Sequence, residues 1–208
     1  MNVQSVIWNL KESAMTNIPV EPSPSPKNPA IRIVSILIIS FILLIAVPTA
    51  YAEWREAGVR MGLQAGPKRE YFHLYEAFGV YGLPWDWRAA SGWGVSPQLS
   101  TSAGALVGGQ ETGFIGSIGT GLVFDKNGKG GAVEAGLNID LLDKRQFGHQ
   151  DFGSVLLWGA YIGLSYRFAS GLGVGYRLQH LSNNRILYSS KIPNPGADLH
   201  MIGVSWHF

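Results

Sequence analysis

A histidine, a serine and a carboxylate lie on either side of one long segment near the C-terminus of the chain. His180 and Ser182 are separated by a single residue, and Asp198 follows after a stretch rich in asparagine, proline and glycine. Where these three residue types meet, the imidazole removes the hydroxyl proton and the carboxylate fixes the tautomer of the imidazole, so the serine becomes a nucleophile toward acyl groups. This chemistry requires a fold that brings both ends of the segment to one surface.

Most of the chain after residue 53 alternates between apolar residues and small or polar ones. In the segment 132–141, apolar side chains occupy the odd positions, and small, polar or acidic residues occupy the even ones. A period of two predicts a β-strand with one apolar and one polar face. Alternation of this kind predicts eight strands, over about 59–64, 71–83, 95–107, 112–124, 132–141, 156–168, 171–181 and 197–208.

Aromatic residues near the strand ends favour a membrane barrel over a soluble β-sandwich, which would alternate as well. They lie on the apolar faces, as in the aromatic girdles of outer-membrane barrels: Phe114, Phe124, Trp158, Tyr166, Phe168, Trp206 and Phe208. The polar faces are rich in glycine, which suits a narrow lumen. We therefore expect an all-β fold, an eight-stranded antiparallel transmembrane β-barrel over residues 53–208, whose even strand number is typical of bacterial outer-membrane barrels.

The first 52 residues predict an export leader. Residues 1–30, rich in proline and polar groups, predict a disordered N-terminal extension. Residues 31–52 combine a basic flank, an uncharged apolar stretch and the small-x-small sequence Ala50-Tyr51-Ala52, which predicts a signal peptide cleaved after Ala52. Two alternatives stay open: a retained anchor, because the uncharged stretch is about long enough to span a bilayer, and translation from Met15.

Composition excludes several classes of function. The chain has no cysteine, which excludes disulfides and thiolate metal sites. Its formal net charge of +2 comes from scattered basic residues, so nothing predicts nucleic-acid binding. His149 and Asp151 lack a third ligand at suitable spacing, so a loop hydrogen bond is expected rather than a metal site, and no cofactor is predicted.

The polar residues of the strand 132–141 have a structural interpretation. Glu134, Asn138 and Asp140 lie on its polar face, which is expected to line the lumen. Buried charges require partners. We expect these residues to pair across the lumen with arginines of other strands: Arg60, Arg167 or Arg177.

Parity along the last two strands puts the three reactive residue types on the lipid-facing side. Counting back by twos from Phe208 along the apolar face reaches Asp198, and the apolar face of the strand 171–181 continues to His180 and Ser182. Polar groups that face hydrocarbon cost several kcal/mol each unless they are paired. Three of them on one patch therefore indicate mutual pairing and a function.

Connection lengths predict the orientation of the barrel. With the N-terminus in the periplasm, the connections after the second, fourth and sixth strands are periplasmic: 84–92, 125–128 and 169–171. The exterior connections are 66–69, 108–110, 143–150 and 183–196. The candidate site adjoins the last of these, so it is expected at the outer leaflet.

The sequence resembles the PagL-type lipid A 3-O-deacylases, outer-membrane barrels that cleave an ester-linked acyl chain from lipopolysaccharide. The strongest motifs are His180-x-Ser182-Asn183 and Asn194-x-Gly196-x-Asp198. The resemblance covers most of residues 53–208 and includes further short motifs: Tyr75-Glu76, Leu83-Pro84-Trp85, Arg145-Gln146-Phe147-Gly148 and Gln150-Asp151-Phe152-Gly153.

The resemblance implies a role for each residue of these motifs. His180 would be the general base, Ser182 the nucleophile and Asp198 the orienting acid, whereas the oxyanion would be held by backbone N–H groups near Asn184 or by the side-chain amide of Asn183. Asp198 stands where the best-known members carry glutamate, and Asn184 stands where they usually carry a small residue.

The implied partner is lipid A within the outer membrane. Lipid A carries phosphates, which four basic residues of the exterior loops are candidates to bind: Lys144, Arg145, Arg185 and Lys191. A solvated rim without catalytic consequence is an equal alternative for each of them.

Other functions remain open from the sequence alone. A small structural or adhesive outer-membrane barrel would contain the His-x-Ser-Asn motif by coincidence, but it has no reason to place three polar residues on the lipid side. An acyltransferase would use similar groups and deliver the acyl chain to a sugar instead of water. The sequence also leaves open the association of two copies into a homodimer.

Overall fold

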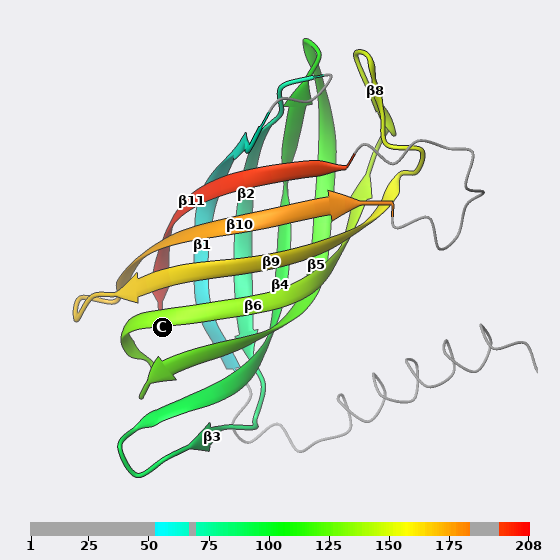
Figure 1. Cartoon of the computed structure of the whole chain (residues 1–208). Coiled ribbons are helices and arrows are strands. Elements are labelled where there is room, and N and C mark those ends of the chain that lie inside the picture. The colour runs from blue at the N-terminus through cyan, green and yellow to red at the C-terminus, as the bar shows by residue number, and fades with distance from the viewer. Residues whose placement is uncertain (1–52, 67–69, 184–195) are drawn as a thin grey trace, which may run out of the picture. The chain divides into compact units, whose positions relative to one another are not determined.

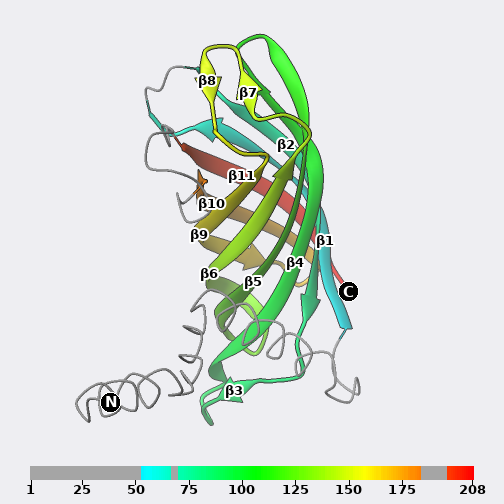
Figure 2. The same ribbon diagram turned by 90° about the vertical axis from the view of Figure 1, so that its right-hand side faces the viewer.

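The computed structural model describes residues 53–66, 70–183 and 196–208, so the expected N-terminal extension and signal peptide lie outside the described residues. Eight long antiparallel strands form a closed barrel (Figures 1 and 2): β1 (Glu53–Gln64), β2 (His73–Gly82), β4 (Trp93–Gly108), β5 (Glu111–Lys126), β6 (Lys129–Leu142), β9 (Leu156–Arg167), β10 (Leu172–Ser182) and β11 (Ala197–His207). Each strand pairs with its neighbours in the order β2-β1-β11-β10-β9-β6-β5-β4, and pairing of β2 with β4 closes the wall. The predicted barrel is confirmed.

Three two-residue strands were not predicted. β3 (Trp87–Arg88) pairs with β4, whereas β7 (Gln146–Phe147) and β8 (Gln150–Asp151) pair with each other in a small hairpin that is not hydrogen-bonded into the barrel sheet. We call the end of the barrel that carries this hairpin the hairpin end, and the opposite end, with β3 and the β5–β6 and β9–β10 connections, the turn end (Figure 1). No helix in the described ranges is long and apolar enough to cross a membrane.

The connection between β5 and β6 illustrates how the sequence sets the turns. Asn127 and Gly128 have φ values of 54° and 66°, and two consecutive positive φ angles are what a two-residue type I′ hairpin requires. The N–H of Gly128 also donates to Asp125 Oδ1 at 2.7 Å. The tight turn expected at 125–128 is therefore present.

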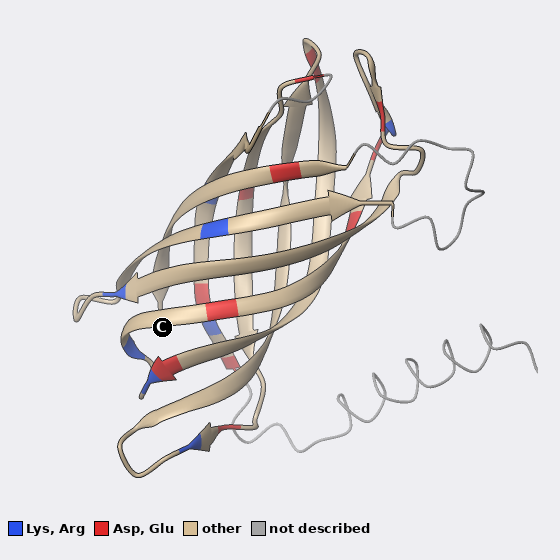
Figure 3. Ribbon diagram, in the orientation of Figure 1, with Lys and Arg blue, Asp and Glu red and all other residues tan. Residues whose placement is uncertain are grey.

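The outward face of the wall is apolar. Every long strand exposes large apolar side chains, and Val59, Leu137 and Ile202 are each more than half exposed. Charged residues lie both near the ends of the strands and within them (Figure 3), and the arginine–glutamate ion pairs within the described strands have side chains at most 17% exposed. An apolar outer face fits the hydrocarbon layer of a membrane.

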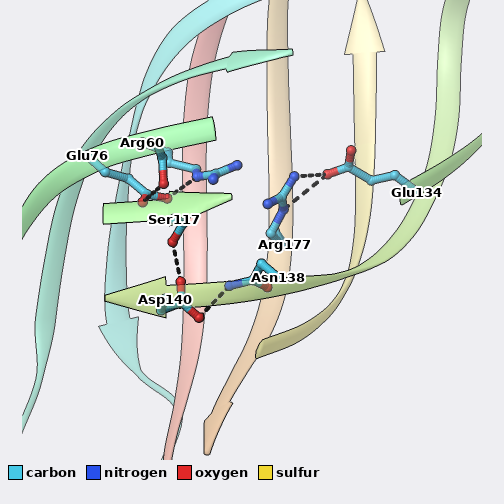
Figure 4. A network of polar contacts seen from close by, with 8 residues as sticks. Arg60, Glu76, Ser117, Glu134, Asn138, Asp140 and Arg177 are labelled. Atoms are coloured by element: carbon cyan, nitrogen blue, oxygen red, sulfur yellow. Dashed lines mark hydrogen bonds and ion pairs between the residues drawn. The ribbon is translucent and has the colours of Figure 1, made fainter. Parts of the chain in front are cut away.

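Ion pairs occupy the middle of the lumen (Figure 4). The Arg177 guanidinium donates to Glu134 Oε1 at 2.8 Å, and Arg60 forms an ion pair with Glu76. The expected pairing of Glu134 with an arginine of another strand is confirmed. Because all four side chains are largely buried, each charge depends on its partner to offset the cost of removing it from water.

Asp140 departs from the expected arrangement. Its carboxylate accepts hydrogen bonds from the Ser117 hydroxyl and the Asn138 amide (Figure 4), and no arginine of the described residues forms an ion pair with it. The prediction that Asp140 and Asn138 pair with arginines is therefore wrong. The reason lies in the register, because Ser117 of β5 stands directly opposite Asp140 of β6.

An apolar core fills the lumen toward the hairpin end. Its buried side chains come from the wall strands and from the segment that carries the β7–β8 hairpin: Phe72, Leu74, Leu106, Ile115, Leu142, Phe147, Phe152, Leu157, Leu181, Ala197, Leu199 and Met201. This core supports the inner side of β10 and β11, at the same end of the barrel as the candidate catalytic residues.

Candidate active site

The antiparallel pairing of β10 and β11 brings His180 directly opposite Asp198. The distance from His180 Nδ1 to Asp198 Oδ1 is 2.6 Å, and the two side chains are 54% and 43% exposed on the outer face. Their neighbours Leu181 and Leu199 are fully buried on the lumen side. The outward direction predicted from parity is therefore observed for both residues.

This contact defines which nitrogen of His180 can take part in a reaction. A carboxylate only accepts hydrogen bonds, so Nδ1–H is the donor toward Asp198, and Nε2 is the atom left to receive a proton. The shorter aspartate reaches the imidazole because the two residues are cross-strand partners. The imidazole and the carboxylate therefore lie together on the outer face.

Ser182 is the last residue of β10 and shares the outward face with His180. It is half-buried, between the buried residues Leu181 and Asn183. Because side chains two residues apart along a strand point to the same side, the Ser182 hydroxyl and the His180 imidazole both belong to the lipid-facing surface.

Asn183 points in the opposite direction. Its side chain is buried, and Nδ2 donates a hydrogen bond of 2.8 Å to the carbonyl oxygen of Phe152. The side-chain amide is thereby held away from the outward surface that carries Ser182. Of the two oxyanion donors considered from the sequence, the Asn183 side-chain amide therefore does not face that surface. Asn184 lies outside the described residues.

Gly196 allows the start of β11 to approach the imidazole closely. Its φ is +56°, and a Cβ atom added there would lie 2.8 Å from the Leu181 carbonyl oxygen and 3.4 Å from His180 Cε1. Glycine tolerates a positive φ without steric cost. The positive φ and the close contacts therefore explain why glycine stands at this position of the Asn-x-Gly-x-Asp motif.

A shallow groove of about 500 Å³ runs along the outer wall beside the His180–Asp198 pair. Ala160, Ile162 and Leu178 contribute apolar side chains to its lining. Ala160 stands opposite His180 in the β9–β10 register, so a small side chain faces the imidazole. The groove is suited to an alkyl chain lying against the wall next to the base.

A second polar pair lies on the same outward face, farther from the hairpin end. The Tyr176 hydroxyl and His200 Nδ1 are 2.5 Å apart, and both residues are exposed. His200 lies two residues after Asp198 on β11, so the two side chains share the outward face. The contact of His200 with Tyr176 depends on the diagonal between two strands, which the sequence does not specify.

The basic residues expected to bind phosphate have acidic neighbours. Lys144 Nζ lies 2.7 Å from Glu111 Oε2, and Arg145 Nε lies 3.6 Å from Asp151 Oδ1. The Arg145 side chain is 60% exposed. Both residues belong to the β6–β9 connection, as predicted, and Arg185 and Lys191 lie outside the described residues.

His149 at the tip of the β7–β8 hairpin is tied to the β1–β2 connection. Its ring Nδ1 and its backbone N–H both lie within 2.8 Å of Glu70 Oε1. These hydrogen bonds lower the pKa of Glu70. The predicted loop hydrogen bond is therefore present. Among the residues described by the structure, no three His, Asp or Glu side chains are grouped as metal ligands.

The fold and the site together define a membrane β-barrel with a serine, a histidine and a carboxylate on its lipid-facing wall. The chain belongs to the lipid A 3-O-deacylase (PagL) family, whose model matches residues 70–207. Its fold is also similar to the crystal structure of the outer membrane enzyme PagL, with 20% sequence identity, coverage of 74% of this chain and 99% of that chain, and a TM-score of 0.63.

Two other solved structures are more distant. Neisserial surface protein A is 13% identical, with coverage of 76% of this chain and 99% of that chain and a TM-score of 0.45. Yersinia pestis Ail is 13% identical, with coverage of 74% and 99% and a TM-score of 0.38. Comparison with curated protein sequences gave no match.

Proposed function

We propose that this protein is an outer-membrane lipid A deacylase that hydrolyses the ester-linked acyl chain at the 3-O position through Ser182, His180 and Asp198. One observation carries the proposal: a histidine hydrogen-bonded to a carboxylate at 2.6 Å on the lipid-facing wall. A buried pair of this kind would serve stability, whereas a pair on the outer face is accessible to the ester of a membrane lipid.

The proposed reaction proceeds in two acyl-transfer steps. Ser182 Oγ attacks the ester carbonyl carbon while His180 Nε2 takes its proton, and Asp198 stabilises the imidazolium that forms. The tetrahedral intermediate expels the sugar oxygen, which receives the proton from His180. Water, deprotonated by the same nitrogen, then attacks the carbonyl carbon of the acyl-serine. The fatty acid is released, and the proton on His180 returns to Ser182 Oγ.

Two further elements complete the proposed site. Backbone N–H groups at the Asn183–Asn184 junction would hold the oxyanion, since backbone donors are the usual elements of such sites. The apolar groove beside His180 would hold the alkyl part of the acyl chain while its carbonyl reaches Ser182. The active site would then face the outer leaflet, where lipid A resides.

The substrate phosphates would contact the rim of the hairpin end. Arg145 is the strongest described candidate, because its side chain is well exposed and its separation of 3.6 Å from Asp151 is long for an ion pair. Lys144 is held closer by Glu111, so a phosphate would have to displace that carboxylate. Arg185 and Lys191 complete the proposed set of phosphate contacts.

Mass spectrometry of lipid A tests the proposal. Cells producing the wild type should contain lipid A that lacks one ester-linked acyl chain, and cells producing folded Ser182→Ala should retain it. Unchanged lipid A in the presence of folded wild type would refute the deacylase function. Lipid A that gains an acyl chain would identify a transferase instead.

A further inference from the structure

The β7–β8 hairpin makes hydrogen bonds to both ends of the connection between β10 and β11. Gln150 Nε2 donates to the Gly196 carbonyl oxygen at 2.9 Å, just before β11 begins. At the other end, Asn183 donates to the carbonyl oxygen of Phe152, directly after the hairpin. Both bonds are buried, and both join residues distant in the sequence.

The segment that carries the hairpin packs into the apolar core of the lumen. Phe147 and Phe152 are fully buried, and their rings lie 5.9 Å and 5.4 Å from the ring of Phe72 on the β1–β2 side. The same apolar core includes Leu181 and Ala197, which are cross-strand partners on the inner face of β10 and β11. The outer face of this pair of strands carries the proposed catalytic residues.

From these contacts we infer that Gln150 is a positioning residue for catalysis, which acts through Gly196 on the spacing between Ser182 and the His180–Asp198 pair. The inference rests on the proposed function. Gly196 lies two residues before Asp198 and adjoins the His180 ring. A hydrogen bond to its carbonyl oxygen therefore fixes the backbone next to both the imidazole and the carboxylate.

Among the described residues, Gln150 makes one directed polar contact through its side chain, the hydrogen bond to Gly196. Its side chain is fully buried, and Oε1 has no hydrogen-bond partner among the described residues, so the amide makes a single directed contact. A buried amide with one unmatched oxygen is costly. An apolar residue would fill the same volume without this cost, so what the amide adds is the directed hydrogen bond to Gly196.

The magnitude expected follows from geometry. Misplacement of reacting groups by about 1 Å reduces catalysis by roughly 100-fold. Gln150→Met keeps the volume of the side chain but cannot donate to Gly196. We expect kcat to fall between about 10-fold and 100-fold, with KM within about twofold of the wild type, because substrate contacts on the outer wall are unchanged.

The experiment compares fatty acid release from lipid A by the full-length wild type, Gln150→Met and Gln146→Met in detergent micelles. Gln146 is the matched control, because it lies in the same hairpin and its amide donates to the Gly148 carbonyl oxygen at 3.3 Å on the exposed surface. Heat-modifiable gel mobility gives the folded fraction of each variant. If Gln150→Met lowers that fraction, Gln150→Asn, whose amide is one methylene too short to reach Gly196, replaces it.

A fall in kcat for the folded Gln150 variant alone supports the inference. Wild-type kcat in that variant, or an equal fall in the Gln146 control, overturns it and leaves the deacylase proposal intact. A loss expressed mainly as a raised KM also overturns it. A folded wild type that releases no fatty acid overturns the proposed function, and this inference with it.

Discussion

Replacing Asp198 with asparagine removes the charge that faces the imidazole and leaves the shape of the side chain nearly unchanged. In the proposed mechanism the imidazolium forms as Ser182 gives up its proton, so the charge of Asp198 would act on the transition state. With Nδ1 and Oδ1 2.6 Å apart, the two charge centres are separated by about 4 Å, which corresponds to about 4 kcal/mol at an effective dielectric constant of 20. Since each 1.36 kcal/mol is a factor of ten, kcat should fall by about 1,000-fold.

Fatty acid release from lipid A by purified, folded protein measures this effect. Asp198→Glu is the control, because it keeps the charge and adds one methylene to a pair that already fits; we expect its kcat to stay within about tenfold of the wild type. An Asp198→Asn variant that retained more than a tenth of wild-type kcat would show that the carboxylate does not act on the base, and the proposed mechanism would have to be abandoned.

Three further predictions concern the surroundings of the site. Gly196→Ala should lower both kcat and the unfolding midpoint, because a positive φ costs a residue with a Cβ about 1–2 kcal/mol; wild-type values for both would contradict the strain. Tyr176→Phe or His200→Phe alone should lower the free energy of unfolding in vesicles by about 1–3 kcal/mol. The double variant should lose less than the sum of the two, because it leaves no polar group without its partner. Strict additivity would argue against the pairing. Hydrogen bonds from His149 lower the pKa of Glu70. The contact is therefore complete above the pKa of an unfolded glutamate, about 4.3, and is lost as the pH falls through the lower pKa of the folded protein. Amide hydrogen exchange in the hairpin should rise in that pH range in the wild type, and Glu70→Gln should show no such step.

The strands and the direction of the site residues could be predicted because both follow from a period of two. A strand that alternates along its whole length fixes which side chains face outward, and this placed His180 and Asp198 on the lipid side before any pairing was known. The opposition of these two residues was a further consequence of joining two consecutive antiparallel strands. Local pattern and global fold agree here, so the prediction was confirmed.

The support behind the site could not be predicted in the same way. β7 and β8 are two residues long, so they show no alternation, and the contact from Gln150 to Gly196 spans 46 residues with nothing in the local sequence to indicate it. The pairing of Asp140 was misjudged for a related reason: charge complementarity suggests a partner type, but the stagger between strands decides which side chain stands opposite.

Mass spectrometry of the protein and its peptides after treatment with a long-chain alkyl fluorophosphonate tests the central claim most directly, because this reagent reacts much faster with a serine activated by a neighbouring base than with an ordinary hydroxyl. The account predicts a single adduct on Ser182 in the folded protein, absent from Ser182→Ala and formed far more slowly in Asp198→Asn. A folded wild type that remains unmodified, or that carries its adduct on another residue, would contradict it.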